Sequence, residues 1–251
     1  MIVGIIPSRY ASSRFPGKPL IDLQGKTMIQ RVYEQASASK HLDKVVVATD
    51  DQRIFDHVRS FGGDVVMTAS DHPSGTDRCN EALHSLKEKY DYVINIQGDE
   101  PLISPDQIDE LAVLLKDGSV ELATQMIPVK TKEELFDNKE VKIVLNTNNE
   151  ALYFSRQVIP FIKDVEESKW HFHHQYYRHV GMYAYRSDVL NKITKLPVSS
   201  LEKAESLEQL RWLENGFKIK CVITKFESIC VDTPEDAERV RSILSSTNPN
   251  P

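Results

Sequence analysis

Three cations gather in a loop directly after the first apolar segment of the chain. Residues 2–6 (Ile-Val-Gly-Ile-Ile) predict a buried strand, and the loop that follows carries Arg9, Arg14 and Lys18. Guanidinium forks and a lysine charge suit several phosphates in a row, and the carboxyl end of the first strand is a usual ligand site in α/β sheets. The loop matches neither the dinucleotide fingerprint nor the P-loop pattern. We therefore predict a different kind of nucleotide phosphate loop; a solvated basic loop is the alternative.

Two carboxylates could hold a divalent cation against those phosphates. Asp99 follows the apolar run 92–97 inside the sequence Gln-Gly-Asp-Glu-Pro, and Asp232 stands two residues before Pro234. Mg²⁺ binds one or two carboxylates together with phosphate oxygens and water, so this pair predicts a Mg²⁺ site. Each residue also has a structural interpretation. Asp99 could cap the helix that follows Pro105, and Asp232 could be a helix N-cap.

A third polar loop covers residues 71–78. Ser74, Gly75 and Thr76 stand at the expected start of a helix, where backbone N–H groups favour anions. Base or ribose contacts are the functional interpretation, and ordinary helix capping explains Ser74 or Thr76 equally well.

Further polar side chains lie in the later half of the chain: Arg156, His179, Tyr183 and Tyr185. The spacing of Glu205, Glu208 and Gln209 predicts that these three share one helical face. Ser199 and Glu202 have the spacing of a capping box at the start of that helix. Hydrogen bonding to sugar hydroxyls is the functional interpretation of the face, and a solvated polar face is the alternative.

An alternating pattern of strands and helices must position the early residues. Apolar runs are separated by segments of helical length, which predicts a parallel, doubly wound sheet. The runs lie at 2–6, 45–49, 64–67 and 92–97, and the helical segments at about 27–39, 51–61 and 75–89. Because parallel strands end at one edge of their sheet, the loops at 7–18, 68–78 and 97–101 are expected to share one crevice.

From about residue 121 the pattern changes to strands joined by short turns. The turn signal Asn-Thr-Asn-Asn at 146–149 separates two of them, which predicts a mixed, partly antiparallel extension over about 121–190. The expected strands are 122–126, 141–145, 151–154 and 180–185. A strand at 220–224 and a helix from Pro234 close the chain.

Composition limits the partners and the compartment. The 251 residues include 31 basic and 37 acidic side chains, a net charge of −6, which argues against a nucleic-acid or membrane-surface binder. No apolar segment is long enough to span a bilayer, and no secretory leader pattern is present. Three cysteines, Cys79, Cys221 and Cys230, show no paired spacing and read as reduced, mostly buried thiols. We expect a cytoplasmic protein.

Six ordered motifs carry a resemblance to a known family. They are PSRYASSRFPGKPL at 7–20, HPSGTDR at 72–78, NIQGDEP at 95–101, RHVGMYAYR at 178–186, ESLEQLR at 205–211 and VDTPED at 231–236. Over about residues 2–240 the chain resembles the 3-deoxy-manno-octulosonate cytidylyltransferase (CMP-Kdo synthetase) family.

The resemblance implies a fold, a reaction and a set of partners. The fold would be α/β, a nucleotide-diphospho-sugar transferase-like (Rossmann-like) mixed sheet flanked by helices. Residues 1–251 would form one nucleotidyltransferase domain, with a sugar-binding and dimerisation extension at about 121–190. The enzyme would use Mg²⁺ to join CTP and 3-deoxy-D-manno-octulosonate (Kdo), giving CMP-Kdo and pyrophosphate for lipopolysaccharide biosynthesis. It would act as a homodimer.

The resemblance also assigns roles to individual residues. Those implied in catalysis are Lys18, Asp99 and Asp232, of which Asp99 and Asp232 would hold the metal. Those implied in nucleotide binding are Arg9, Lys18, Ser74, Arg78 and Gln97. Those implied in sugar binding are Gln97, Arg156, His179, Tyr183, Glu208 and Gln209.

Two alternatives stay open at this point. The first is a cytidylyltransferase for another acidic sugar, either sialic-acid-like or an 8-amino variant. The second is a non-catalytic nucleotide-binding protein. The complete set of Lys18, Asp99 and Asp232 argues against the second alternative.

Overall fold

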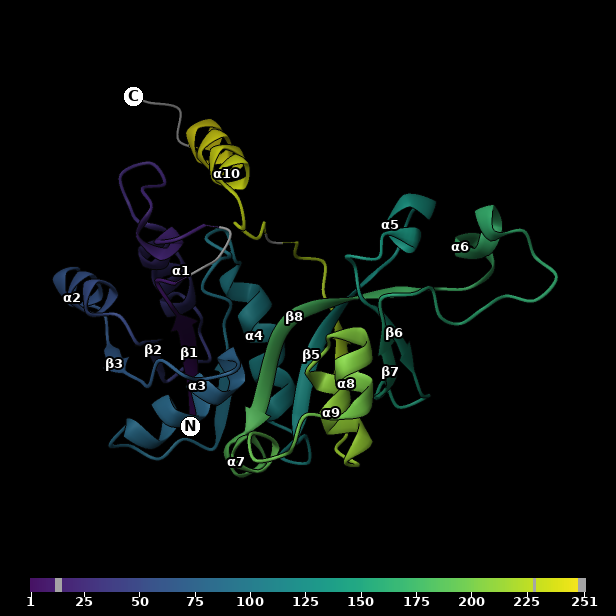
Figure 1. The fold of residues 1–251 in the computed structure, drawn as a ribbon, viewed down its shortest axis with the longest axis horizontal. Coiled ribbons are helices and arrows are strands. Elements are labelled where there is room, and N and C mark those ends of the chain that lie inside the picture. Colours follow the sequence, from purple (N-terminus) through teal and green to yellow (C-terminus); the bar gives the residue numbers. More distant parts are fainter. Residues whose placement is uncertain (12–14, 228, 248–251) are drawn as a thin grey trace. The chain divides into compact units, whose positions relative to one another are not determined.

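The computed structural model describes residues 1–11, 15–227 and 229–247. Arg14, one of the three predicted loop cations, therefore lies outside the described residues, as does the end of the C-terminal tail. The chain divides into two compact units (Figure 1), one of Met1–Val113 with Phe226–Pro251 and one of Leu114–Lys225. The prediction of one domain with an extension at about 121–190 stays a prediction.

The first unit is built on a parallel sheet with the strand order β3-β2-β1-β4. Its strands are β1 (Ile2–Ser8), β2 (Lys44–Thr49), β3 (Val65–Met67) and β4 (Tyr92–Asn95). Its helices are η1 (Lys18–Leu20), α1 (Met28–Ser37), α2 (Gln52–Ser60), α3 (Gly75–Ser85), α4 (Pro105–Leu115) and α10 (Pro234–Thr247). The predicted parallel, doubly wound sheet is confirmed.

Strand order explains where this unit places a ligand. From β1 the chain moves outward through α1, β2, α2 and β3, and α3 then carries it back to β4 on the other side of β1. The direction of winding reverses between β1 and β4, and such a switch point is where open α/β sheets bind ligands, at the carboxyl ends of the strands. The segments after β1 and β4 are the ones that carry Arg9 and Asp99.

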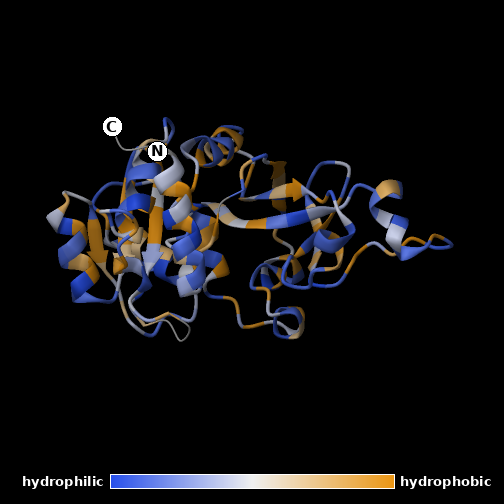
Figure 2. Cartoon of the chain, turned by 90° about the horizontal axis from the view of Figure 1, so that it is seen from above, coloured by the Kyte–Doolittle hydropathy of each residue, from blue (hydrophilic) through white to orange (hydrophobic). Residues whose placement is uncertain are grey.

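Local sequence sets the helix starts, and apolar burial holds them in place. Thr27, Asp51 and Ser74 each cap a helix by accepting a hydrogen bond from a backbone N–H in its first turn. Hydrophobic residues are concentrated in the strands of this unit, while the neighbouring helices alternate hydrophobic and hydrophilic positions (Figure 2). A separate apolar cluster brings the end of the chain back, because Val231 and Val240 are buried against Met28.

The second unit is a mixed sheet. Strand β5 pairs antiparallel with β8 and parallel with β9, while β6 pairs antiparallel with both β7 and β8. The strands are β5 (Leu122–Pro128), β6 (Lys142–Leu145), β7 (Ala151–Ser155), β8 (Tyr177–Arg186) and β9 (Ile219–Ile223). The helices are α5 (Lys132–Phe136), η2 (Glu167–Lys169), α6 (Trp170–His173), α7 (Ser187–Ile193), α8 (Ser200–Glu205) and α9 (Gln209–Glu214). The mixed, partly antiparallel arrangement is confirmed.

One helix prediction is wrong. The capping box of Ser199 and Glu202 forms as predicted, but α8 ends at Glu205, and the C-cap residue Ser206 has a left-handed backbone conformation with φ of 54°. A second short helix, α9, then begins at Gln209. Glu205, Glu208 and Gln209 therefore do not share one helical face, because a left-handed residue reverses the local course of the chain.

Among the described residues, no helix combines the length and the apolar character needed to cross a bilayer.

Candidate active site

The site in the first unit forms where β1 and β4 end. Gly98 follows β4 and lies so close to the chain leaving β1 that a methyl group on it would stand 2.8 Å from the Pro7 carbonyl oxygen. Glycine is therefore the residue that lets the two segments meet. Gly17, with a left-handed φ of 73°, turns the first loop so that its N–H donates to the Tyr10 carbonyl oxygen at 2.9 Å. The turn brings Lys18 to the switch point.

The Lys18 ammonium lies between the two predicted metal ligands. Its Nζ donates to Asp99 Oδ2 at 2.8 Å, to Asp232 Oδ1 at 3.1 Å and to the Val231 carbonyl oxygen at 3.1 Å. The Val231 N–H in turn donates to the Asp99 carbonyl oxygen at 2.8 Å, which fastens the segment before α10 to the segment after β4. Two carboxylates from distant parts of the sequence thus converge on one cation.

Electrostatics favour the charged form of this lysine. Burial alone would lower the pKa of Lys18, but the negative charge of Asp99 and hydrogen bonds to Asp99 and Asp232 outweigh it and hold the pKa above its ordinary value. The side chains are only partly exposed, at 15% for Lys18, 25% for Asp99 and 35% for Asp232. The three groups form an ion-pair cluster that solvent screens only in part.

The N-cap interpretation of Asp232 is wrong. The N-cap of α10 is Thr233, whose Oγ1 accepts from the Asp236 N–H at 3.2 Å, while Asp236 Oδ2 accepts from the backbone N–H groups of Asp232 and Thr233. The capping requirement is therefore met without the Asp232 carboxylate. Asp99 Oδ2 accepts from Lys18, and the capping interpretation of Asp99 stays a prediction.

This cluster lines one cleft of the first unit, and a second cleft of the same unit adjoins it. The first, of about 250 Å³, includes Arg9, Lys18, Gln97, Asp99 and Asp232 in its lining. The second, of about 170 Å³, is also lined by Arg9 and Gln97, and adds the loop 72–75 and Arg78. The three loops that the sequence places at one edge do share a crevice, and every predicted nucleotide-binding residue lines it.

Two of those residues have structural partners as well. Ser74 caps α3, accepting from the Asp77 N–H at 3.2 Å and donating to Asp77 Oδ2 at 2.7 Å. Arg78 is buried, and its NH1 donates to Thr68 Oγ1 at 2.6 Å while NH2 donates to Asp50 Oδ2 at 3.3 Å. The capping interpretation of Ser74 is confirmed, and Ser74 also lines the second cleft.

In the second unit the structure brings two of the predicted sugar residues together. The rings of His179 and Tyr183, both on β8, have centroids 5.1 Å apart, and Tyr183 also meets Trp212 edge-on at 5.1 Å. His179 Nε2 is 2.9 Å from Thr124 Oγ1. Desolvation lowers the pKa of His179 to about 3, so the imidazole is neutral at pH 7. The buried Tyr183 hydroxyl has no hydrogen-bond partner among the described residues.

Arg156 belongs to a different pocket. It follows β7, and its Nε donates to the Glu205 carbonyl oxygen at 2.8 Å, while its terminal nitrogens are a long 3.5 Å from the carbonyl oxygens of Asn138 and Ser206. Its backbone N–H donates to Glu205 Oε2 at 2.9 Å. Arg156 lines a pocket of about 580 Å³. A guanidinium at such a place can pair with a carboxylate in the bidentate manner typical of arginine.

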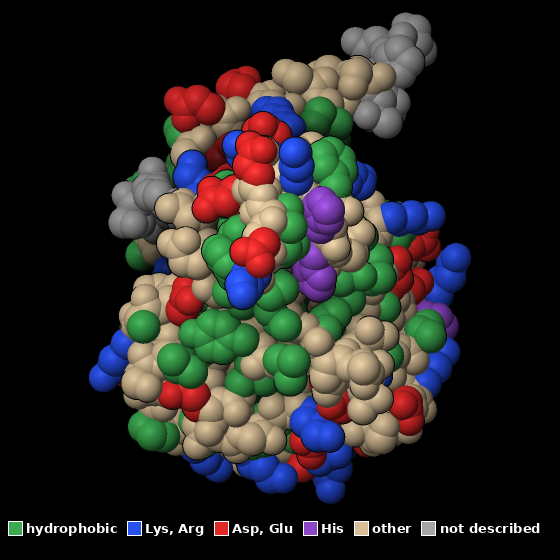
Figure 3. Space-filling model, turned by 90° about the vertical axis from the view of Figure 1, so that its right-hand side faces the viewer, with side chains coloured by type: hydrophobic (Ala, Val, Ile, Leu, Met, Phe, Trp, Pro, Cys, Tyr) green, Lys and Arg blue, Asp and Glu red, His purple; other side chains and the backbone are tan. Residues whose placement is uncertain are grey.

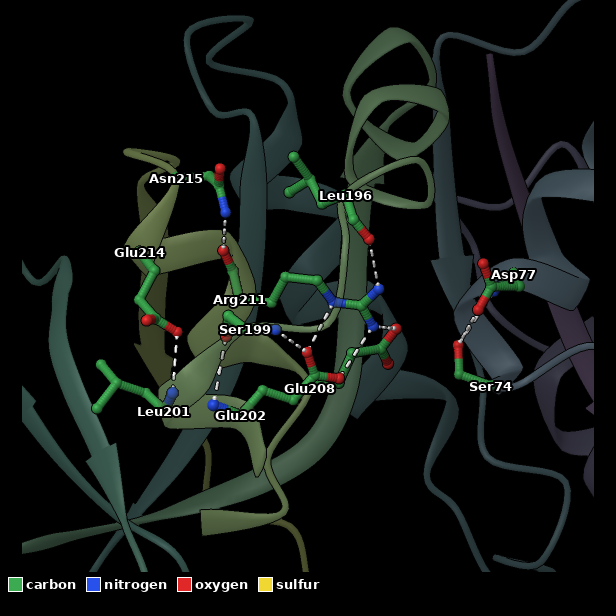
Figure 4. A network of polar contacts seen from close by, with 10 residues as sticks. All are labelled: Ser74, Asp77, Leu196, Ser199, Leu201, Glu202, Glu208, Arg211, Glu214 and Asn215. Carbon is green, nitrogen blue, oxygen red and sulfur yellow. Dashed lines mark hydrogen bonds and ion pairs between the residues drawn. The ribbon is translucent and has the colours of Figure 1, made fainter. Parts of the chain in front are cut away.

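Glu208 and Gln209 lie at the start of α9, and Glu208 meets the buried Arg211 (Figure 4). Arg211 donates to Glu208 Oε1 at 3.3 Å, to the Leu196 carbonyl oxygen at 3.0 Å and to Glu202 Oε1 at 3.1 Å. Gln209 is 5% exposed. Arg211 therefore fixes the orientation of Glu208, a contact that the spacing of Glu205, Glu208 and Gln209 does not predict.

Comparison with known proteins decides the family. A family model described as Cytidylyltransferase matches residues 3–220. The chain belongs to the cytidylyltransferase family. The resemblance seen in the motifs is confirmed.

The relatives of this cytidylyltransferase sequence span nearly its whole length. It is 54% identical to the 3-deoxy-manno-octulosonate cytidylyltransferase of Parabacteroides distasonis over 248 residues, 97% of this chain and 98% of the relative. It is 50% identical over 238 residues, 94% of this chain and 95% of the relative, to the 8-amino-3,8-dideoxy-manno-octulosonate cytidylyltransferase of Shewanella frigidimarina. Enzymes for two related sugars thus stand at similar distances from the chain.

Solved structures confirm the fold of this family member. A CMP:2-keto-3-deoxy-manno-octonic acid synthetase complexed with CTP is 42% identical and superposes with a TM-score of 0.91, covering 98% of this chain and 99% of the other. A cytidylyltransferase from Leptospira borgpetersenii superposes at 0.64 with 17% identity, which shows the fold alone.

One functional candidate has no counterpart in the sequence reasoning. Within the described part of the chain, Asp99, Cys230 and Asp232 form a group in which one ligand atom from each lies within 4.8 Å of the others. Cys230 is exposed, whereas the free thiols of Cys79 and Cys221 are buried. The sequence offers one indication of this group, the spacing of Cys230 and Asp232. Residues two apart lie on the same side wherever a chain is extended.

Proposed function

We propose that this protein is a 3-deoxy-manno-octulosonate cytidylyltransferase. It transfers the cytidylyl group of CTP to the anomeric hydroxyl of Kdo, with release of pyrophosphate and formation of CMP-Kdo. The observation that carries this proposal is the convergence of Lys18, Asp99 and Asp232 at the switch point of the parallel sheet. Relatives of known name at about half identity over nearly the full chain support the choice of substrates.

The first unit binds the nucleotide. Arg9 and Lys18 supply positive charge to a triphosphate that carries about four negative charges, and Ser74, Arg78 and Gln97 line the adjoining cleft where the cytidine and ribose fit. Little covalent chemistry is asked of the protein in a transfer of this kind, since positioning and charge neutralisation supply most of the rate. Lys18 serves the leaving pyrophosphate, whose charge grows as the bond breaks.

Asp99 and Asp232 are the residues that would hold Mg²⁺. They fit the ion because both offer carboxylate oxygens and both already approach one cation, the Lys18 ammonium, within 3.1 Å. When bound, Mg²⁺ neutralises phosphate charge and lowers the pKa of a coordinated hydroxyl. With Mg²⁺ on the two carboxylates, the ammonium of Lys18 would pair with phosphate oxygens instead.

The second unit supplies the sugar-binding residues. His179 is neutral at pH 7, so it can hydrogen bond to a hydroxyl but cannot neutralise the sugar carboxylate. The charge of the acid is therefore recognised by Arg156, which lines a pocket of the second unit. Tyr183 brings a buried hydroxyl for which the described part of the chain offers no partner, and Glu208 and Gln209 add polar groups at the start of α9.

We also propose a homodimer. The segment from β7 to β8 carries two large exposed apolar side chains, Phe161 and Phe172, which are 71% and 78% exposed. Figure 3 views the side from which this segment projects and shows hydrophobic and histidine side chains at the surface. Exposed aromatic groups of this kind are typical of a contact surface, and a second copy would cover them. A cytoplasmic location and a place in lipopolysaccharide biosynthesis belong to the same proposal.

The 8-amino analogue of Kdo is a second candidate substrate, because the 8-amino-3,8-dideoxy-manno-octulosonate cytidylyltransferase of Shewanella frigidimarina is 50% identical to this chain. The experiment that tests both is pyrophosphate release, measured with CTP, UTP, ATP and GTP against Kdo, its 8-amino analogue and a sialic acid. We expect the highest kcat/KM for CTP with Kdo. A higher kcat/KM for the 8-amino sugar would make that sugar the substrate in place of Kdo. Pyrophosphate release without any acidic sugar would contradict the proposal.

A further inference from the structure

Cys230 lies beside the carboxylate pair. Cys230, Val231 and Asp232 are exposed, buried and half-buried in turn. Val231 is fully buried in the apolar cluster with Met28 and Val240, which anchors the segment between its two neighbours. The ligand atoms of Cys230 and Asp232 both lie within 4.8 Å of that of Asp99.

The three side chains form a mixed set of donors. One sulfur and two carboxylate oxygens lie within 4.8 Å of one another. In a tetrahedral zinc site with ordinary bond lengths, sulfur and oxygen donors are about 3.6 Å apart. The hydrogen bond from the Val231 N–H to the Asp99 carbonyl oxygen holds the two backbone segments together. Rotation of each side chain about its own bonds then covers the remaining distance between the donor atoms.

A cation already lies against the two carboxylates of this set. The Lys18 ammonium donates to Asp99 and to Asp232, and also to the carbonyl oxygen of Val231, between Cys230 and Asp232 in sequence. The local field is therefore one that collects positive charge, and this observation is independent of the cysteine. Magnesium is a hard ion that takes oxygen ligands, so a thiol adds little for it. A thiolate instead favours softer ions such as Zn²⁺, Co²⁺ and Cd²⁺.

We propose that Cys230, Asp99 and Asp232 together bind a thiophilic divalent cation, which displaces the Lys18 ammonium. The proposal rests on the carboxylate site of the proposed function and adds its metal selectivity. As the sulfur–metal bond forms, the thiol proton passes to solvent and the thiolate donates its electron pair to the ion. An ion held in this way blocks the position in which Mg²⁺ would serve the transfer, so Zn²⁺ is an inhibitor.

The test uses Co²⁺ alone, added to the full-length protein without nucleotide and followed by absorption spectroscopy. We expect a near-ultraviolet band from thiolate-to-cobalt charge transfer, which Zn²⁺ removes by competition. Cys230→Ser and Cys230→Ala should abolish the band and weaken Co²⁺ binding about tenfold or more, since even outer-shell substitutions at metal sites cost that much. Cys221→Ala is the matched control and should keep the band, because Cys221 is outside the cluster.

Carboxylate variants keep this inference separate from the proposed function. If Asp99→Asn and Asp232→Asn lose Co²⁺ binding while Cys230→Ser keeps both the band and the affinity, the role of Cys230 is refuted and the carboxylate site stands. If the two asparagine variants bind Co²⁺ and Mg²⁺ as the wild type does, the carboxylate site itself is wrong. Circular dichroism of each variant checks that its fold is retained.

Discussion

Replacing Asp232 with asparagine separates a functional carboxylate from a structural one. The Asp232→Asn variant keeps the size of the side chain and removes the charge that accepts from Lys18 at 3.1 Å. The side chain is 35% exposed, so the ion pair contributes only about 0.2–1 kcal/mol to folding. A group that stabilises charge in the transition state contributes more, about 2.7–4 kcal/mol, or roughly 10²–10³ in kcat. We expect kcat to fall by that factor with little change in unfolding.

The neighbouring cap provides the control. Thr233→Val removes the hydroxyl that caps α10, which should lower the free energy of unfolding by about 1 kcal/mol. This variant should keep its kcat at a temperature where it is folded. The assay is steady-state pyrophosphate release at saturating CTP and Kdo, with chemical unfolding of each variant alongside. The reasoning is refuted if Asp232→Asn turns over like the wild type while losing stability as Thr233→Val does.

The remaining predictions concern other parts of the molecule. Lys18→Ala should weaken CTP binding in calorimetry and lower kcat; a variant in which only the unfolding temperature changes would make the basic loop a solvated surface. Arg156→Ala should raise the KM for the sugar or lower kcat by about 1.5–3 kcal/mol in free energy, with unchanged CTP affinity and poor rescue by lysine; weakened CTP binding with normal sugar kinetics would move Arg156 to the nucleotide side. Gly98→Ala should lower the free energy of unfolding by about 1–3 kcal/mol, because the new methyl group meets the Pro7 carbonyl oxygen at 2.8 Å, and an unchanged denaturation midpoint would contradict that contact. The pKa of His179 is depressed to about 3, so the folded protein binds fewer protons than the unfolded chain between that pH and the ordinary pKa of 6.5; the free energy of unfolding therefore falls as the pH drops below 6.5. His179→Gln should flatten that part of the pH–stability profile, and a variant profile parallel to that of the wild type would contradict this role of His179.

The parallel sheet was predictable because each of its strands is a short apolar run that ends in polar residues. Runs such as 45–49 and 92–97 are short, apolar and rich in β-branched side chains, as is typical of a buried strand. The loops after them were predictable for the same reason, since parallel strands end at one edge. The helix starts at Ser74 and Ser199 followed from local capping chemistry.

The features that could not be predicted from the sequence are an unusual backbone conformation and contacts between residues far apart in the chain. The break after α8 depends on a left-handed conformation at Ser206, and serine gives no such signal, whereas glycine would have done so. The cap of α10 could not be divided between Asp232 and Thr233 from their order alone, because both are good N-cap residues. Lys18 was predicted to meet phosphate, but its bonds to Asp99 and Asp232 depend on how α10 packs against Met28.

The most direct test of the central claim follows the α-phosphorus of CTP. The protein is incubated with Mg²⁺, Kdo and CTP labelled at the α-phosphate, and the products are separated by charge. Our account predicts that the label moves into a sugar ester of CMP, in equal amount to the pyrophosphate released, and that Asp99→Asn and Asp232→Asn nearly abolish this transfer. Label that remains in CTP, or that appears in CDP or free CMP without the sugar, would contradict it.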